Sequence, residues 1–427
     1  MRKKTLIWLM GYMGGIGTSF IKGPIIALAT YMYTFYTQFT SWAKGAHGRW
    51  SLYVSLTLLA SYLIKKGSLE KLQHLKMPQF KWLILILINM FLVTPFAAVP
   101  AKNNATIVEY VKLLILYYLI ISVIRTRKDY KIFLWAQILG NFNLGWEAYT
   151  RGRTVRGRLE NIGAPGITGS NFLASHTIMV LPFVAISVLF GNKREKLAGS
   201  VCGAFIFNTL ILCNSRGAFI SVAAMTFCAF ILGKKWMWKK FILGLVLGVV
   251  GVTAIGGAER VMARLETVQS YEDEPSASGR VDTWKGAWKM AMDYPIGKGG
   301  DGFAELSPIY IPEVVEHHGG SKRAVHNTYL MMLTNWGFQG LILFLGFIGS
   351  TIRELDRVRK RTGSKDDKFY HLHGLAIELA LIAYSISSIF GNRIYFESLY
   401  WYTSIATALS NIQQSEIKDV MDEDEKK

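Results

Sequence analysis

Long apolar runs, which recur along most of this chain of 427 residues, constrain its fold more than any other feature. Each run is roughly 16 to 20 residues long, close to the length that a helix needs to cross a hydrocarbon core of about 30 Å. Only 18% of the residues are charged, against 51% that are hydrophobic. Strands of a membrane barrel would instead show short segments of alternating polarity, so the runs indicate helices. The sequence therefore predicts an all-α polytopic membrane protein.

The apolar runs predict about 12 transmembrane helices, with both ends of the chain in the cytoplasm. The predicted spans are residues 5–40, 50–64, 81–98, 107–124, 131–148, 171–190, 197–213, 217–233, 241–257, 327–350, 373–390 and 394–411. The first region contains several glycines and Pro24, so we expect it to cross once, as a broken or partly re-entrant helix. Its basic start resembles a signal peptide, but the apolar region continues to Phe39, and we interpret it as an uncleaved segment.

The net charge of +19 is best explained by membrane topology. In a soluble protein this charge would suggest a nucleic-acid partner, but here the basic residues gather in short loops, as the positive-inside rule requires. The five basic clusters lie within residues 65–81, 125–131, 193–196, 234–240 and 353–368. We therefore expect these loops to be cytoplasmic, and the partners to include membrane lipids and no nucleic acid.

The remaining loops face the other side of the membrane, and each contains arginine. These outer segments are residues 151–170, 214–216, 258–326 and 391–393. An arginine retained there needs a physical reason, because the positive-inside rule depletes outer loops of basic residues. The topology divides the chain into five predicted domains. They are an N-terminal transmembrane region (1–170) with a basic outer loop (150–170), central transmembrane helices (171–257), a long, partly helical outer loop (258–326), C-terminal transmembrane helices (327–411) and a cytoplasmic tail (412–427).

Several outer arginines are candidate ligands for an anion. Arg216 lies between two strongly apolar spans, where an ionisable group indicates function, although a long side chain there also reaches the interface by snorkelling. Arg156 and Arg158 belong to a basic loop that either lines a site for an anionic substrate or contacts lipid headgroups. Arg280 is predicted to begin a helix after Ser278, so its guanidinium and the helix N-terminus are expected to hold an anion together.

His326 is a further polar residue in an unusual place, because it stands directly before the apolar segment that starts at residue 327. A single histidine at a helix start is often structural, but imidazole is also the side chain best suited to accept a proton near neutral pH. Cys202, Cys213 and Cys228 all fall in apolar spans and form no ligand pattern. The sequence therefore predicts no metal site and no cofactor.

Four short motifs together resemble the core of the O-antigen ligase and polymerase superfamily. They are Ser215-Arg216-Gly217, Ser278-Gly279-Arg280 with Trp284, Asp293-Tyr294-Pro295-Ile296-Gly297 leading to Phe303, and His326-Asn327-Thr328-Tyr329-Leu330 with Trp336-Gly337 and Gly340. The resemblance covers approximately residues 170–350. It implies a GT-C-like glycosyltransferase of the bacterial inner (plasma) membrane whose active site faces the periplasm, so that the loop 258–326 is periplasmic.

The same resemblance implies a reaction and a set of site residues. The donor is a glycan linked to undecaprenyl diphosphate, and in the ligases the acceptor is the lipid A–core oligosaccharide. Arg216 and Arg280 would bind the diphosphate, and His326 would act as the general base of a metal-independent, inverting transfer. Polysaccharide polymerases and protein O-oligosaccharyltransferases of the superfamily remain alternatives, and a lipid-linked oligosaccharide transporter is the non-enzymatic one. The single long outer loop favours the ligase.

Overall fold

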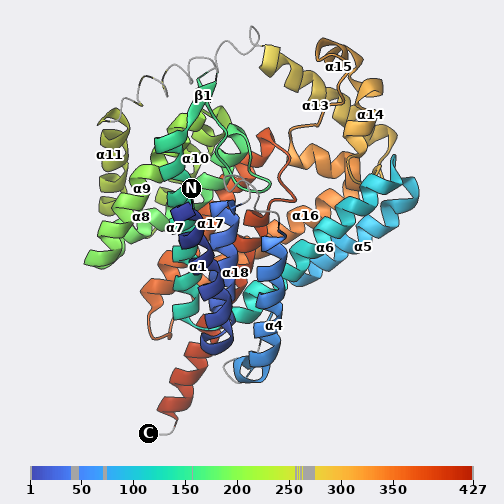
Figure 1. The fold of residues 1–427 in the computed structure, drawn as a ribbon. Helices are drawn as coiled ribbons and strands as arrows, with labels where there is room; N and C mark the ends of the chain where they lie inside the picture. The colour runs from blue at the N-terminus through green and yellow to red at the C-terminus, as the bar shows by residue number, and fades with distance from the viewer. Residues whose placement is uncertain are drawn as a thin grey trace.

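Helices make up nearly all of the regular structure (Figure 1). The computed structural model describes residues 2–39, 48–70, 75–155, 157–254 and 275–425, with the single positions 257, 259 and 262. In chain order the elements are α1 (Arg2–Lys22), α2 (Pro24–Thr37), α4 (Trp50–Glu70), α5 (Phe80–Val93), η1 (Thr94–Phe96), α6 (Pro100–Val123), α7 (Arg127–Arg151), β1 (Arg153–Val155), β2 (Arg158–Glu160), α8 (Ser170–Phe190), α9 (Lys193–Cys213), α10 (Arg216–Leu232), η2 (Lys235–Met237), α11 (Trp238–Ala254), α13 (Pro275–Asp293), α14 (Gly302–Tyr310), α15 (Pro312–His317), α16 (Thr328–Lys360), α17 (Asp367–Ser387), η4 (Ser388–Phe390) and α18 (Glu397–Asp424).

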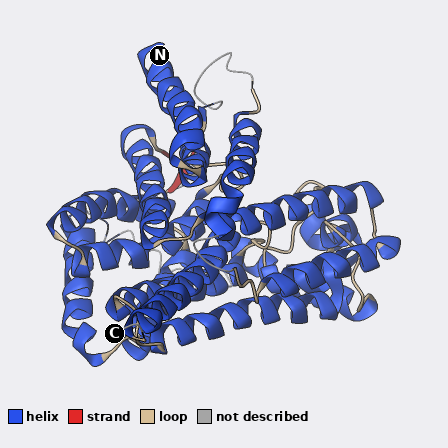
Figure 2. Ribbon diagram, turned by 90° about the horizontal axis from the view of Figure 1, so that it is seen from below, coloured by secondary structure: helices blue, strands red, loops and turns tan. Residues whose placement is uncertain are grey.

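The helices have the length and composition of a membrane protein. Among the described residues, 6 helical segments are long and apolar enough to cross a bilayer. They are Pro100–Val123, Ser170–Phe190, Lys193–Cys213, Lys235–Thr253, Thr328–Lys360 and Asp367–Phe390, and two shorter apolar segments are Phe80–Phe96 and Arg216–Leu232. Figure 2 shows the same dominance of helix, interrupted by one small patch of strand. The prediction of an all-α membrane protein is confirmed, whereas the count of about 12 spans stays a prediction.

The N-terminal region differs from the predicted single crossing of residues 5–40. Helices α1 and α2 form an antiparallel hairpin, since the indole N–H of Trp8 donates to the hydroxyl of Thr37 at 2.6 Å. The chain reverses at Gly23, whose φ of 112° is unfavourable for any residue with a Cβ. Both ends of the hairpin therefore lie at the same level, and the prediction of one net crossing is wrong.

The open end of this hairpin lies beside the predicted outer loop 151–170. The side-chain amide of Gln38 donates to the carbonyl of Gly163, and Lys4 Nζ lies 3.7 Å from Glu147 Oε1, near the end of α7. The cytoplasmic location of the N-terminus stays a prediction.

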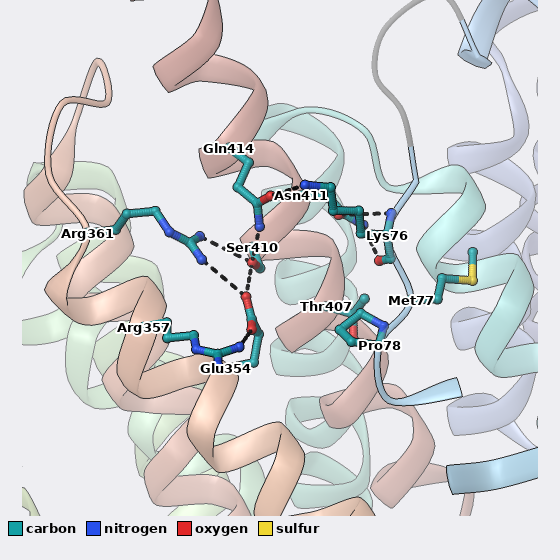
Figure 3. A pocket seen from close by; sticks show the side chains of 10 residues that line it. All are labelled: Lys76, Met77, Pro78, Glu354, Arg357, Arg361, Thr407, Ser410, Asn411 and Gln414. Carbon is teal, nitrogen blue, oxygen red and sulfur yellow. Dashed lines mark hydrogen bonds and ion pairs between the residues drawn. The ribbon is translucent and has the colours of Figure 1, made fainter. Parts of the chain in front are cut away.

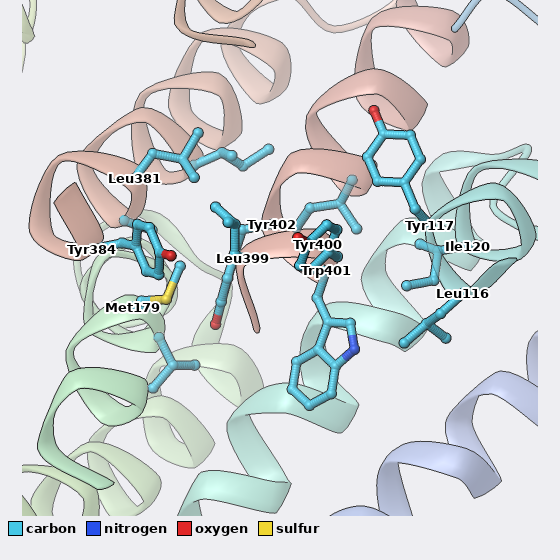
Figure 4. Close-up of a cluster of buried hydrophobic side chains, with 14 of the residues drawn as sticks. Leu116, Tyr117, Ile120, Met179, Leu381, Tyr384, Leu399, Tyr400, Trp401 and Tyr402 are labelled. Carbon is cyan, nitrogen blue, oxygen red and sulfur yellow. The ribbon is translucent and has the colours of Figure 1, made fainter. Parts of the chain in front are cut away.

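Helix α18 lies at the centre of the buried core. Every residue of this helix from Ser398 to Gln413 is buried. Figure 4 shows Leu399, Tyr400, Trp401 and Tyr402 surrounded by side chains of α6, α8 and α17. The helix also carries small hydroxyl residues, which donate to carbonyls of their own helix: Thr403 to Leu399 at 2.7 Å and Ser404 to Trp401 at 2.8 Å. These bonds satisfy the hydroxyl groups of Thr403 and Ser404, which helps a partly polar helix to be tolerated in the middle of the protein.

The predicted outer loop is attached to α16 at a kink. Gly337 interrupts α16 with φ 73° and ψ −178°, and this break leaves backbone groups of the helix without helical partners. The segment that follows α13 supplies them: the Lys298 N–H donates to the Thr334 carbonyl at 2.9 Å, and the Phe338 N–H donates to the Pro295 carbonyl at 3.0 Å. The Asp-Tyr-Pro-Ile-Gly motif therefore fixes the loop against α16.

Alanine at Gly337 tests this attachment. A Cβ there would lie 2.4 Å from the Ile296 carbonyl oxygen, in a backbone conformation that is essentially restricted to glycine. We expect Gly337→Ala to lower the free energy of unfolding by about 1–3 kcal/mol, seen as a lower melting temperature in detergent. Gly349→Ala, in the same helix with no atom within 4 Å of its Cβ position, is the control and is expected to be neutral or slightly stabilising. Equal melting temperatures for the two variants would show that the kink does not need glycine.

Candidate active site

The predicted outer segments meet at one end of the helices. Figure 1 shows β1 and helices α13 to α15 at this end, with the C-terminus at the opposite end. The turn before α10 is joined to the β-hairpin, because the Asn214 amide donates to the Gly157 carbonyl at 3.3 Å. The start of α16 is joined to residues 391–393, because the Asn327 N–H donates to the Asn392 side chain at 3.1 Å. Segments far apart in sequence thus form one polar region.

Arg216 is the first residue of α10, and a tight turn places it there. Asn214 ends α9 in the left-handed conformation (φ 48°), which asparagine tolerates better than most residues, and Ser215 precedes the new helix. The next residue is Gly217, where a Cβ would lie 2.9 Å from the ring of Phe390. The glycine of the Ser-Arg-Gly motif therefore lets α10 begin directly against η4, and Arg216 lies beside the 391–393 segment.

Arg158 lies in the β-hairpin, where Gly157 has a positive φ of 71° in the turn between the strands. The half-buried guanidinium of Arg158 donates to the side-chain oxygen of Asn171, in the first turn of α8. The Ser215 hydroxyl donates to the same oxygen at 3.0 Å. Asn171 thus connects Arg158 to the turn that carries Arg216. The other candidate of this loop, Arg156, lies outside the described residues.

Arg280 lies within α13 and not at its start. The helix begins at Pro275, five residues earlier than Arg280, so the predicted contribution of a helix N-terminus at this arginine is wrong. The same helix supports the histidine: the indole N–H of Trp284 donates to the Val325 carbonyl at 3.2 Å. Trp284 therefore acts as a packing residue that holds the segment before His326.

His326 has an unusual backbone and a strongly perturbed imidazole. Its φ of 53° lies in the left-handed region, and such conformations in residues other than glycine gather at functional sites. Asn327 then caps α16, because its side-chain oxygen accepts from the N–H groups of Tyr329 and Leu330. These two features turn the chain sharply and hold the half-buried His326 directly before the first turn of α16.

The charge around His326 is positive on several sides. Burial lowers the pKa of the imidazole to about 4, and the nearby guanidiniums of Arg280, Arg323 and Arg393 act in the same direction. His326 is consequently neutral at pH 7, the form that accepts a proton. The structure thus brings the predicted Arg280 and His326 together, while Arg158 and Ser215, the residue before Arg216, are connected to Arg393 through Asn171.

Two further arginines, Arg323 and Arg393, belong to the site. Neither was predicted as a site residue from the sequence. Arg393 stands out there only as part of an outer segment, yet its side chain is 2% exposed. Burial lowers the pKa of its guanidinium to about 9, and the charge of Arg280 acts in the same direction, so Arg393 stays protonated at neutral pH. An arginine in a short link between two apolar spans, the same signal that identifies Arg216, would have indicated it.

A polar cavity lies at the end of α16 that is farther from His326 (Figure 3). Its volume is about 570 Å³, and it is lined by Lys76, Met77, Pro78, Glu354, Arg357, Arg361, Thr407, Ser410, Asn411 and Gln414. Its charges are largely paired with one another: Glu354 lies 3.1 Å from Arg357 and 3.3 Å from Arg361. We therefore place the candidate active site at His326. In the described part of the chain, no group of three or more His, Cys, Asp or Glu side chains is arranged to hold a metal ion.

The fold and the site define a helical membrane protein with a cationic, histidine-containing site at one end of its helices. Residues 201–345 match the family described as O-antigen ligase. The resemblance predicted from the motifs is confirmed for this segment. It contains Arg216, Arg280 and His326, and it ends before Arg393. No curated protein matches the chain.

The lowered pKa of His326 predicts the pH dependence of any reaction in which it is the base. Only the neutral imidazole accepts a proton, so kcat/KM should stay constant from pH 8 downward and fall as the pH decreases through about 4. Removing one of the neighbouring charges should raise this pKa. Arg323→Gln is therefore expected to move the acid limb of the profile to higher pH, toward the ordinary value of 6.5.

Lys322→Gln is the matched control for this experiment. It removes the same charge one residue away, but Lys322 pairs with Glu305 and does not perturb His326. The measurement is kcat/KM at donor concentrations below saturation, because this quantity reports the free enzyme. An acid limb of the wild-type profile near pH 6.5 would contradict the assigned environment of His326. Equal shifts of the acid limb in Arg323→Gln and Lys322→Gln would contradict it as well.

Proposed function

We propose that the protein transfers a glycan from undecaprenyl diphosphate to the lipid A–core oligosaccharide at the periplasmic face of the bacterial inner membrane. The observation that best supports this proposal is the neutral His326 among several guanidiniums, a combination of a proton acceptor with anion-binding groups. The match of residues 201–345 to the O-antigen ligase family supports the reaction type.

The proposed reaction is a direct displacement. The oxygen of an acceptor hydroxyl attacks the anomeric carbon of the donor, the bond from that carbon to the diphosphate oxygen breaks, and the configuration inverts. His326 takes the hydroxyl proton during the attack and later releases it to water. The products are the glycosylated acceptor and undecaprenyl diphosphate.

Arginines stabilise the leaving group in this scheme. Negative charge grows on the diphosphate as the bond breaks, and Arg216 and Arg280 donate charge-assisted hydrogen bonds to it, with greater effect where water is scarce. We extend the proposal to Arg158, since it is half-buried and shares Asn171 with the turn that carries Arg216. Because guanidiniums provide the charge stabilisation, the proposed transfer is metal-independent and uses no cofactor.

Replacement of the proposed base is the direct test. His326→Ala should lower the rate of glycan transfer by about 10²–10⁴-fold, the usual contribution of a general base. His317→Ala is the control, because His317 is exposed in the same outer loop and should leave the rate unchanged. The assay uses protein in nanodiscs, undecaprenyl-diphosphate-linked glycan and rough lipopolysaccharide in EDTA, with the products separated on a gel.

Each result separates the proposal from an alternative. Transfer that survives EDTA and is lost only in His326→Ala supports a metal-independent ligase. Lengthened donor glycan without acceptor modification would identify a polymerase, and transfer to a protein serine would identify an O-oligosaccharyltransferase. Movement of the lipid-linked glycan across the bilayer without any transfer would identify a transporter.

A further inference from the structure

Arg393 is the most deeply buried charge of the candidate site, and its link between η4 and α18 is tightly held. The hydroxyl of Thr328 donates to the Gly391 carbonyl at 2.6 Å, and the Arg393 N–H donates back to the same hydroxyl at 3.0 Å. The Tyr384 hydroxyl donates to the Arg393 carbonyl at 2.9 Å. The backbone of Arg393 is therefore fixed to the start of α16, two residues after His326.

The guanidinium of Arg393 is only partly satisfied by the protein. Its Nη2 donates to the Asn171 carbonyl at 3.4 Å, while Nε and Nη1, both buried, have no hydrogen-bond partner. Among the described residues no carboxylate forms an ion pair with it, and the nearby cation Arg280 adds to the effect of burial in lowering its pKa. A buried cation with free N–H groups is strongly unfavourable unless an anion joins it.

Arg393 is placed where it can bind an anion that other residues of the site also contact. It acts electrostatically on His326 and Arg280. It also donates to the backbone carbonyl of Asn171, whose side-chain oxygen accepts from Arg158 and from Ser215, the residue before Arg216. A Cβ at Gly391 would lie 3.0 Å from Nη2 of Arg393. Glycine at this position therefore lets the guanidinium lie close to the backbone of residue 391.

We infer that Arg393 is a third diphosphate-binding arginine, which holds a phosphate of the lipid diphosphate through Nε and Nη1. Paired N–H groups of a guanidinium match two oxygens of one phosphate, a geometry that lysine lacks. The identity of the anion rests on the proposed function. The residue itself lies outside the segment that matches the O-antigen ligase family.

Binding of inorganic pyrophosphate tests this inference without any glycan transfer. Calorimetric titration of protein in phosphatidylcholine nanodiscs should show affinity reduced about 10- to 100-fold in Arg393→Gln, and reduced by a smaller factor in Arg393→Lys, which keeps the charge. Arg153→Gln, which removes an exposed arginine of β1, is the control and should bind within about twofold of wild type. Affinity in Arg393→Gln equal to that of the control would overturn the inference.

Two further measurements distinguish the lipid diphosphate from a phospholipid headgroup and from a folding defect. In the first, the titration is repeated with phosphatidylglycerol in the nanodiscs, and loss of pyrophosphate binding there would overturn the assignment to the diphosphate. If Arg393→Gln does not fold, a structure of wild-type protein with undecaprenyl diphosphate decides the question. A phosphate oxygen about 2.7–3.0 Å from Nε or Nη1 supports the inference, and a phosphate held elsewhere contradicts it.

The pyrophosphate titration tests Arg393 independently of the glycan acceptor. Pyrophosphate binding that depends on Arg393 in a protein that never modifies lipopolysaccharide would leave this inference standing and remove the ligase proposal. Normal ligation, combined with pyrophosphate binding that is unchanged when Arg393 is replaced, would support the ligase proposal and overturn this inference.

Discussion

Residues 391–393 are hydrogen-bonded to the first residues of α16, and the candidate site depends on this junction. His326 and Arg393 are 67 positions apart in sequence, and each follows or precedes a helix that packs in the core. The bonds from Asn327 to Asn392 and from Thr328 to Gly391 join the two at the same level. Asn171 then adds the start of α8 through the Arg393 guanidinium. Three helix ends are thereby held together, and the rigid helices behind them keep the charged groups in place.

The cost of this arrangement is mutual repulsion between cations in a region that is poorly accessible to water. Arg280, Arg323 and Arg393 all act on His326, and they oppose its protonation. A neutral histidine therefore adds no further positive charge to the site, and a bound anion reduces the repulsion between the guanidiniums by pairing with them. The same electrostatics that keep the base unprotonated thus favour a negatively charged ligand. Both effects serve a reaction in which a proton is taken up while an anion departs.

The sequence predicts the features that follow from local rules. Apolar length identifies the helices, and Arg216, Arg280 and His326 stand out because each breaks the expected pattern for a loop at a membrane surface. The α1–α2 hairpin escapes prediction because hydropathy measures the length of an apolar run and not the reversal at Gly23. The start of α13 is misplaced because Pro275, which suits the first turn of a helix, competes with the later serine caps. The short link between two apolar spans would have indicated Arg393, but its contact with Asn171 could not be predicted, because the two residues are 222 positions apart.

The motifs that carry the family resemblance contain two kinds of residue. Arg216, Arg280 and His326 are the candidate site residues, whereas the glycines and Trp284 determine the backbone that presents them. Gly217 lets α10 start against Phe390, and Gly297 and Gly337 let the outer loop join α16 where a Cβ at either position would approach backbone atoms to 2.5 Å and 2.4 Å. Trp284 holds the carbonyl of Val325, the residue before His326. The short, scattered form of the motifs therefore has a physical reason: the site needs a few charged groups, and each of them needs one neighbour that lets the chain turn.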